Sequence, residues 1–264
     1  GVQTCALPIS QTPMILFGGA TATLLKGRGS LQDIDQLSIM RPITKWATSV
    51  STVPALGPTV ERAVQIATSG VPGPVFVEVP LDILYSESMV RALYEKEAGL
   101  GKAKGIAGKA LEWYIRAHLY KQFNAPALPG LGGRDLGLPE LRMPPVRGND
   151  AAVAAAARAL ATAQRPVIVV GNQTMVGLRN ADPTINALSR LGVPVYLAGS
   201  ARGLLGRSHP LQFRHARGAA LKESDCVIVL GFPFDFRLGY GRGFARGGTL
   251  IAANLSAQEL RKNR

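Results

Sequence analysis

Short apolar runs that end in glycine constrain the fold of this 264-residue chain more than any other feature. Three runs share this form: Met14–Phe17 before Gly18-Gly19, Pro166–Val170 before Gly171, and Cys226–Leu230 before Gly231. Such a run is typical of a buried strand whose carboxyl end opens into a loop. Between the runs, Thr59–Ser69 carries apolar residues at helical spacing. Because strands that alternate with helices form parallel sheets, the sequence predicts an α/β fold.

The loop after the first run carries the first candidate site residues. In parallel sheets, ligands bind just outside the carboxyl ends of the strands. Gly18 and Gly19 close the run, and Gln32, Asp33 and Asp35 follow in a polar loop. Asp33 and Asp35 are either a carboxylate pair or residues that cap backbone groups, and the capping role is favoured.

The second half of the chain repeats this pattern with features of a nucleotide site. Gly171 is followed by Asn172 and Gln173, and Gly231 ends the later run. Glycine at a strand end lets the backbone approach a phosphate, and helix N-termini favour anions. No G-x-G-x-x-G or P-loop pattern is present, so NAD binding and ATP hydrolysis lack support.

The chain is strongly basic, with a formal net charge of +13. Its arginines form two local groups: Arg202, Arg207, Arg214 and Arg217, then Arg237, Arg242 and Arg246. We expect no nucleic-acid partner, because the basic residues are otherwise scattered and no interleaved aromatic residues are present to stack on bases. A phosphate-bearing cofactor or coenzyme A fits these groups, and a solvated basic face is the alternative.

Other segments and residues exclude several classes of site. Residues 1–11 read as a non-native leader and are set aside, which leaves Cys226 as the one cysteine and excludes a disulfide. Cys226 lies in an apolar run, as expected of a core residue. The histidines lack metal-ligand spacing, so we expect no protein metal site. No apolar run approaches the ~20 residues that span a bilayer.

Several motifs in order resemble thiamine diphosphate enzymes of the acetolactate synthase group. The matching stretches in the first half are Gly29–Gln36, Arg41–Trp46 and Gly73–Asp82. Those in the second half are Gly171–Gln173, Ala201–Pro210 and Leu230–Leu238. The resemblance runs from about Thr12 to the C-terminus, and within the group it is closest to 2-hydroxyacyl-CoA lyases.

The resemblance implies a fold and a division into domains. Residues 12–90 would be the C-terminal part of a pyrimidine-binding α/β domain, and 149–264 a Rossmann-like central domain with a mainly parallel sheet, truncated at its C-terminus. Residues 91–148 would be a linker with one amphipathic helix, Gly108–Phe123. This helix packs across a domain junction or, in the less favoured alternative, lies on a membrane surface.

The resemblance also implies roles for single residues. Gln32 matches the position that points at the substrate side of the thiazolium ring, where its amide would bond an oxygen of the reacting group. The central domain holds FAD or an ADP moiety in relatives, which makes cofactor-binding candidates of the strand-end glycines and five more residues: Asn172, Gln173, Arg202, Asp235 and Arg237. Pro233, Asn254 and Ser256 depart from the flavin-binding pattern, which disfavours FAD and leaves ADP or CoA.

The implied activity belongs to a larger parent protein. It uses thiamine diphosphate and Mg²⁺, although the activating glutamate and the Mg²⁺ and diphosphate ligands are not found in this chain, which alone would be inactive. The expected reaction cleaves 2-hydroxyacyl-CoA to formyl-CoA and a shortened aldehyde. The alternatives are an acetolactate synthase-type carboligase acting on 2-oxo acids, a non-catalytic nucleotide-binding module, and a structural subunit. We expect a homodimer or homotetramer, and a parent anchored in the endoplasmic reticulum membrane with this part soluble.

Overall fold

The computed structural model describes residues 11–98, 105–126 and 148–263. The chain divides into two compact units. The first unit comprises residues up to Ser69 together with Gly73–Leu141, and the second comprises Gly70–Pro72 and Arg142–Arg264. Each unit is described by itself. The domain limits given in the sequence analysis stay predictions, and residues 1–10 of the expected leader lie outside the described residues.

The first unit is built on a three-stranded parallel sheet. The strands are β1 (Met14–Ala20), β2 (Trp46–Ser49) and β3 (Pro74–Pro80), in the order β1-β3-β2. All seven residues of the central strand β3 are buried. Its odd-numbered valines pack with Ala63 and Ala67 of helix α3 (Leu56–Thr68). Since successive side chains of a strand point to opposite faces, Phe76 and Glu78 stand on the other face of the sheet.

Three further helices complete the described part of the first unit. They are α4 (Leu81–Leu84), α5 (Glu87–Ala98) and α6 (Gly105–Asn124). Ile115 and Leu119 of α6 pack with Val90 and Tyr94 of α5. The expected linker helix therefore forms; Ile115 and Leu119 of its predicted stripe are buried within the first unit, whereas Leu111 is exposed.

A buried polar cluster joins α6 to α4. The Asp82 carboxylate accepts hydrogen bonds from the Thr23 hydroxyl (2.5 Å) and the Tyr94 hydroxyl (2.9 Å). The Thr23 hydroxyl also lies 2.9 Å from His118 Nε2. Gln122 Nε2 donates to the Asp82 carbonyl oxygen at 3.1 Å. Helix α6 is thus fixed to α4 by polar contacts as well as by its apolar stripe.

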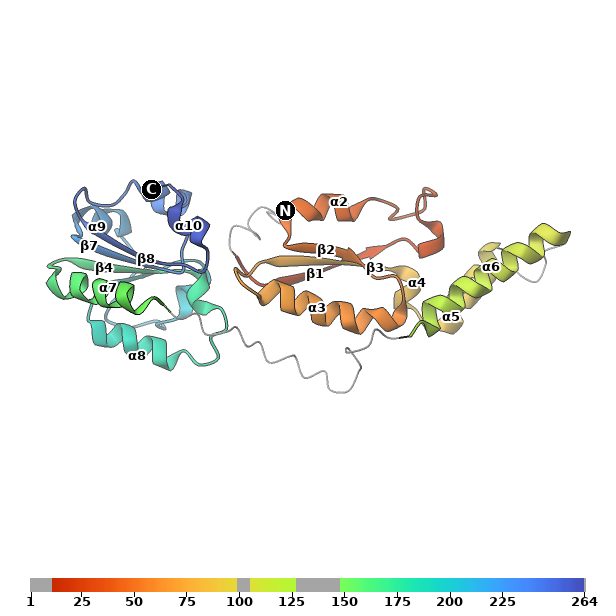
Figure 1. The fold of residues 1–264 in the computed structure, drawn as a ribbon, viewed down its shortest axis with the longest axis horizontal. Coiled ribbons are helices and arrows are strands. Elements are labelled where there is room, and N and C mark those ends of the chain that lie inside the picture. The colour runs from red at the N-terminus through yellow and green to blue at the C-terminus, as the bar shows by residue number, and fades with distance from the viewer. Residues whose placement is uncertain (1–10, 99–104, 127–147, 264) are drawn as a thin grey trace. The chain divides into compact units, whose positions relative to one another are not determined.

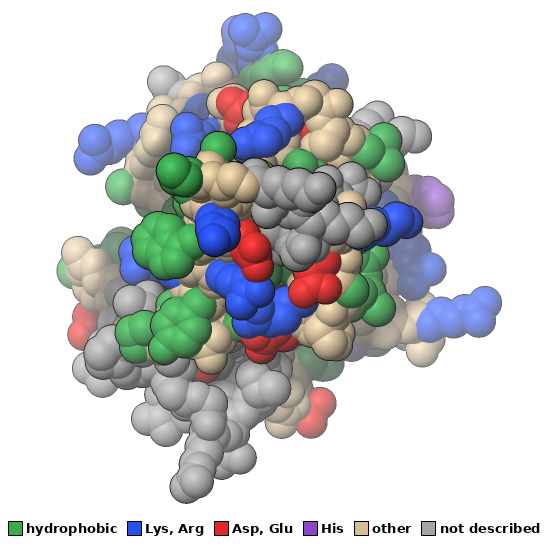
Figure 2. All heavy atoms as spheres, turned by 90° about the vertical axis from the view of Figure 1, so that its right-hand side faces the viewer, with side chains coloured by type: hydrophobic (Ala, Val, Ile, Leu, Met, Phe, Trp, Pro, Cys, Tyr) green, Lys and Arg blue, Asp and Glu red, His purple; other side chains and the backbone are tan. Residues whose placement is uncertain are grey.

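The outer surface of α6 is rich in exposed aromatic and aliphatic side chains. Ile106, Trp113 and Tyr120 are all more than half exposed. Figure 2 is viewed from the side on which α6 is drawn in Figure 1, and it shows hydrophobic side chains among lysines and arginines. None of the helices within the described residues has the length and apolar character needed to cross a membrane.

The second unit is a five-stranded sheet in which every neighbouring pair is parallel. The strands are β4 (Pro166–Val170), β5 (Val195–Leu197), β6 (Gln212–Phe213), β7 (Cys226–Leu230) and β8 (Thr249–Ala253), in the order β6-β5-β4-β7-β8. The helices are α7 (Asp150–Thr162), α8 (Asp182–Leu191), α9 (Arg217–Glu223) and α10 (Ala257–Arg261). Figure 1 shows α7 and α8 on one side of the sheet and α9 on the other.

Alternation along β4 explains the two layers of core. Val167 and Val169 pack toward Leu221 of α9, whereas Ile168 and Val170 pack toward Leu188 of α8. Strands buried on both faces read as continuous apolar runs, which is why the sequence reveals them. The predicted α/β fold with parallel sheets is confirmed.

The structure adds elements that the sequence analysis did not predict. The loop that follows the first run contains the short helix α2 (Gln36–Met40) and leads into β2. Strand β2 is only half-buried and has no glycine at its end, so it lacks both marks of the other strands. Short 3-10 turns also occur: η1 (Thr23–Leu25), η2 (Arg41–Ile43), η3 (Val53–Ala55), η4 (Asn172–Met175), η5 (Gly199–Gly203) and η6 (Phe236–Gly241).

Candidate functional sites at two sheet edges

The carboxyl ends of the strands in the first unit border a cavity of about 140 Å³. Thr21, Lys26 and Gln32 reach it from the loop after β1. Ser49 reaches it from the end of β2, and Glu78 from near the end of β3. The structure therefore brings Gln32, the predicted catalytic residue, to the edge of the sheet where ligands bind in this architecture.

Glu78 is the unexpected member of this first-edge cavity. Its side chain is 1% exposed, and Oε1 accepts a hydrogen bond from Lys26 Nζ at 3.1 Å. Oε2 makes no hydrogen bond with any residue of the described ranges. A buried carboxylate is costly unless each oxygen is paired, so an oxygen without a described partner is a mark of function.

The loop that carries Gln32 is held in a defined shape. Gln32 has a left-handed backbone (φ 66°), which is uncommon outside glycine. The next residue, Asp33, accepts hydrogen bonds from the amides of Gly27 (2.9 Å) and Gly29 (2.8 Å). The Gly27 bond, followed by the Gly29 bond, lowers the pKa of the Asp33 carboxyl. Thr21 and Ser30, whose hydroxyls are 2.5 Å apart, close the same loop.

Asp35 serves the helix that follows. Its carboxylate accepts hydrogen bonds from the backbone amide (3.0 Å) and hydroxyl of Ser38, so it is the N-cap of α2. The bond from the Ser38 hydroxyl is the main cause that lowers the pKa of Asp35. The prediction that Asp33 and Asp35 cap backbone groups is confirmed, and they do not act as a carboxylate pair.

The two glycines at the end of β1 differ in their surroundings. A Cβ on Gly18 would lie 2.5 Å from the Phe76 ring and 2.7 Å from Gln36 Oε1. A Cβ on Gly19 would meet nothing within 4 Å. Gln36 Nε2 donates to the Gly19 carbonyl oxygen at 2.7 Å. Gly18 is therefore required for packing, whereas the space beside Gly19 is open.

In the second unit, the crevice between β4 and β7 is filled by protein. The strand order reverses here, so this is where a doubly wound sheet commonly binds its ligand. A Cβ on Gly171 would lie 2.5 Å from the Gly231 carbonyl oxygen and from Phe232. Gly231 has φ 61°, and its Cβ would lie 2.8 Å from Gln173 and Thr174. The two glycines meet, and at this point they allow the two loops to pack against each other.

Asn172 and Gln173 join the loops around this crevice. The Asn172 side-chain oxygen accepts a hydrogen bond from the Ser200 amide at 2.8 Å. Gln173 accepts one from the Leu255 amide at 2.8 Å and donates to Asn254 at 2.9 Å. Both side chains are buried. These amides hold the loops after β5 and β8 in place.

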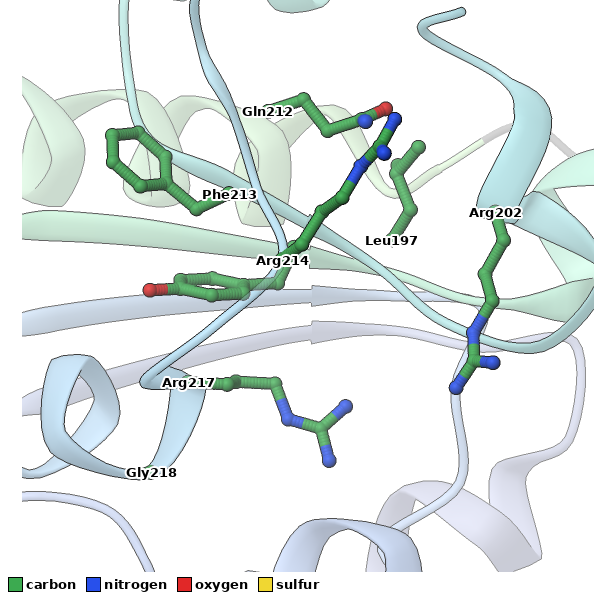
Figure 3. A pocket seen from close by; sticks show the side chains of 8 residues that line it. Leu197, Arg202, Gln212, Phe213, Arg214, Arg217 and Gly218 are labelled. Atoms are coloured by element: carbon green, nitrogen blue, oxygen red, sulfur yellow. The ribbon is translucent and has the colours of Figure 1, made fainter. Parts of the chain in front are cut away.

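An open cavity of the second unit lies beside β5 and β6 instead. A cavity of about 730 Å³ is lined by Arg202, Arg214 and Arg217, with Tyr196 and Phe213 among its apolar walls. Figure 3 shows the three arginines arranged around this space. We call it the arginine cavity. It unites three members of the first arginine group that the sequence analysis singled out.

The guanidinium groups of the arginine cavity differ in how they are held. With its amide oxygen turned toward Arg214, Gln212 accepts hydrogen bonds from that guanidinium at 2.8 and 2.9 Å. Arg217 Nη2 donates to the Arg237 carbonyl oxygen at 2.5 Å. Arg202 is exposed and makes no hydrogen bond or ion pair with any described residue. The cavity thus offers both oriented and adaptable donors to an anion.

Asp235 and Arg237 form a pair of their own. Arg237 donates through Nε (3.0 Å) and Nη2 (2.6 Å) to the Asp235 carboxylate, and its guanidinium lies 4.6 Å from the Phe232 ring centroid. The Asp235 carboxylate also caps η6 through the Arg237 amide. Neither residue lines the arginine cavity, but the Arg237 backbone positions Arg217 within it.

The sequence analysis missed Glu78 and Lys26 as site residues. A carboxylate near the end of an otherwise apolar strand was the available signal, since Pro74–Pro80 contains no other charged or polar side chain. It also missed Tyr196 and Phe213, whose rings lie 6.1 Å apart at the arginine cavity. Nothing in their local sequence separates these two from ordinary core aromatics.

The two edges suit different chemical groups. The arginine cavity combines cationic donors with aromatic walls, which fits the phosphates and base of a nucleotide. The first edge offers a buried acceptor, an ammonium group and an amide, which fits the polar reacting end of a small molecule. No group of three His, Cys, Asp or Glu side chains within the described ranges could hold a metal ion.

Residues 153–264 match the family model described as the thiamine pyrophosphate enzyme central domain. Over 256 residues, the chain is 42% identical to a 2-hydroxyacyl-CoA lyase 2 of Danio rerio, an alignment that covers 97% of this chain and 40% of that protein. The Homo sapiens protein of that name is 40% identical over 257 residues, covering 97% of this chain and 39% of the relative.

A further relative carries a different name. The acetolactate synthase large subunit IlvG of Mycobacterium tuberculosis is 31% identical over 245 residues, covering 93% of this chain and 37% of that protein. The chain therefore spans about 40% of the length of the curated relatives it matches.

Proposed function

We propose that the chain forms part of a thiamine-dependent carbon–carbon lyase that acts on 2-hydroxyacyl-CoA, since residues 153–264 match the central-domain model of thiamine pyrophosphate enzymes. The observation that carries this proposal is the similarity, at about 40% identity over 97% of the chain, to proteins named 2-hydroxyacyl-CoA lyase 2. The reaction would yield formyl-CoA and an aldehyde one carbon shorter.

The two edges take separate parts of this reaction. Thiamine pyrophosphate, when bound, supplies the electron sink for carbon–carbon cleavage. Gln32, at the first-edge cavity, is placed to hydrogen-bond an oxygen of the reacting group. No group of three His, Cys, Asp or Glu side chains that could hold a metal ion lies within the described ranges, so we assign the Mg²⁺ ligands to none of the described residues.

We assign the nucleotide part of coenzyme A to the arginine cavity. Arg202, Arg214 and Arg217 are placed to bind its phosphates, and Tyr196 and Phe213 provide apolar walls beside them. Asn254 and Ser256, which stand where flavin-binding relatives carry acidic residues, are engaged in bonds around the filled crevice. A CoA or ADP moiety is therefore preferred to FAD.

The test of the reaction compares two substrates on the enzyme that contains these residues. We expect thiamine-dependent release of aldehyde and formyl-CoA from 2-hydroxyacyl-CoA, and little product from pyruvate. Acetolactate formation from pyruvate, with 2-hydroxyacyl-CoA untouched, would instead support a carboligase like the relative at 31% identity. Nucleotide binding without either reaction would support a non-catalytic module.

The test of the arginine cavity is a calorimetric titration of CoA, ADP and FAD into the 264-residue chain. Removing a charge-assisted hydrogen bond costs about 1.5–3 kcal/mol, so Arg202→Ala or Arg217→Ala should weaken CoA or ADP binding at least ~10-fold. Arg158→Ala, on the exposed side of α7, is the matched control and should bind as the unsubstituted chain does. Equal affinity in all three variants would remove the assignment.

A further inference from the structure

The carboxylate of Glu78 occupies a position that stability alone does not explain. It is the one charged side chain on a strand whose seven residues are all buried. Replacing a buried ion pair as a whole by apolar residues of similar size is often neutral or stabilising, so the pair of Glu78 with Lys26 is weak evidence of a role in stability. A buried acid with a single described partner thus indicates a chemical use, and the cavity that Glu78 lines is where that use would occur.

The register of the sheet directs Glu78 into this cavity. Glu78 pairs with Gly18 of β1 on one side and with Ser49 of β2 on the other. The Phe76 ring and Gln36 fill the space beside Gly18, whereas the small side chain of Ser49 lines the same cavity as Glu78. Lys26 closes one side through its 3.1 Å contact with Oε1, and Gln32 lines the same cavity. Oε2 is buried and has no hydrogen-bond partner among the described residues, so it is the oxygen left to accept a proton.

We propose that Glu78 accepts the proton of the substrate 2-hydroxyl group, with Lys26 holding the carboxylate in place. This inference rests on the proposed function. The C1–C2 bond breaks as the hydroxyl proton passes to Glu78 and the C2–O bond becomes the carbonyl of the aldehyde. Thiamine pyrophosphate, when bound, would supply the electron sink for the pair left on C1. Glu78 would then return the proton to C1, which is released as the formyl group of formyl-CoA.

This assignment agrees with the chemistry of the groups at the first edge. The reaction consumes no net proton, and one carboxylate that accepts and then returns a proton closes the balance. A carboxylate is a suitable hydrogen-bond acceptor for a hydroxyl group, and such bonds are short and strong. Gln32 also lines the cavity but has a different role, since its amide can donate a hydrogen bond to an oxygen but cannot remove a proton.

The first readout is turnover of 2-hydroxyacyl-CoA by the thiamine-loaded enzyme. Glu78→Gln keeps the size of the side chain but removes the proton acceptor, so kcat should fall 10²–10⁴-fold. The kcat of Lys26→Gln should fall less, because the proton acceptor Glu78 remains. Glu95→Gln, an exposed acid on α5, is the control and should keep the unsubstituted rate. Equal losses in Glu78→Gln and Lys26→Gln would overturn the proposal in favour of a purely structural ion pair.

The second readout is binding without turnover, in enzyme freed of thiamine. The unsubstituted enzyme should prefer 2-hydroxyacyl-CoA to the acyl-CoA that lacks the hydroxyl by about 10-fold. Glu78→Leu should abolish this preference while CoA itself binds as before. If the unsubstituted enzyme neither binds nor cleaves 2-hydroxyacyl-CoA, the proposed function fails. If it does both, and the Glu78 variants keep the rate and the preference, only the role of Glu78 fails.

Discussion

Both sheets of this chain are parallel, but their carboxyl edges differ in what fills them. In the first unit, the strand ends surround a small polar cavity that contains a buried acid. In the second, the corresponding crevice between β4 and β7 is closed by Gly171, Gly231 and two buried amides. Its open space lies two strands away, between arginines at β5 and β6.

The difference shows that a glycine at a strand end has no single meaning. Gly19 has open space where its Cβ would lie, so a ligand could approach the backbone there. Gly171 has protein atoms in that position, so its role is to let two loops pack. The sequence pattern is the same in both cases, and only the neighbouring loops decide between the two roles.

The largest expected effect on stability comes from exchanging Gly171 for alanine, and Gly19→Ala is the counterpart at the other edge. Gly171→Ala forces a Cβ against the Gly231 carbonyl and Phe232, and overpacking of this kind costs about 3 kcal/mol. Gly19→Ala should change stability by less than about 0.5 kcal/mol. Both tryptophans, Trp46 and Trp113, lie in the first unit, so their fluorescence reports that unit alone in urea unfolding.

The outcome can be read by unit. Gly171→Ala should lower the midpoint of the circular-dichroism transition and leave the tryptophan transition in place. Gly203→Ala, which has open space around its Cβ in the second unit, is the matched control and should be neutral. If Gly171→Ala were as mild as Gly203→Ala, the crevice would be looser than the packing indicates.

A smaller effect is expected from the amide that joins the loops of the second unit. Asn172→Ala removes a buried side chain together with the 2.8 Å acceptor of the Ser200 amide, which costs about 1–3 kcal/mol. Asn180→Ala removes an exposed acceptor from the Asp182 amide and should cost less than about 1 kcal/mol. Circular-dichroism unfolding in urea measures both. Equal losses would mean that Asn172 contributes no more than an ordinary surface cap.

How much of this could be predicted from the sequence depends on whether the signal is local. Buried strands such as Pro166–Val170 and Cys226–Leu230 are continuous apolar runs, so both were predicted. Strand β2 was missed because Trp46–Ser49 is short and half-buried. The arginine group was visible as a cluster, but its meeting with Tyr196 depends on the pairing of β5 with β6.

The candidate site illustrates the same limit. Gln32 was identified by resemblance, and its loop position is what the sequence indicated. Glu78 was not identified, because its importance depends on the register that places Gly18 and Ser49 beside it. Asn172 and Gln173 were expected to bind a cofactor, whereas their amides are engaged with Ser200, Leu255 and Asn254. Burial and partners across the sheet are not written in local sequence.

A modest effect of pH is expected at α6. Burial lowers the pKa of His118, which lies against Thr23. The folded state therefore binds fewer protons than the unfolded state just below pH 6.5, and the first unit should lose stability as pH falls through this value. Tryptophan-monitored urea unfolding at pH 5.0, 6.0 and 7.5 measures it. His118→Gln should flatten the dependence and His215→Gln, in the second unit, should not.

The smallest expected effect is on the acid stability of the loop that presents Gln32. This loop is held by a charged carboxylate, whereas the loops of the second edge are held by neutral amides. The Asp33 carboxylate accepts the Gly27 and Gly29 amides, bonds that hold its pKa below the ordinary value of 3.8. Its contribution to the first unit is present above pH 3.8 and is lost as pH falls through the lowered pKa. Asp33→Asn should cost a small amount of stability at pH 7, because its amide offers one acceptor oxygen where the carboxylate offers two, and it should remove this acid-side loss.

Neutral amides perform the corresponding task in the second unit. Asn172 and Gln173 do not titrate, so the loops they join should hold their shape at acid pH. Amide hydrogen exchange at pH 4.5 and pH 2.5 compares the two, after correction for the intrinsic rate. We expect the Gly27 and Gly29 amides to lose protection at the lower pH while the Ser200 and Leu255 amides keep theirs. Matching losses at both edges would indicate general acid unfolding and would remove the distinction between a charged and a neutral edge.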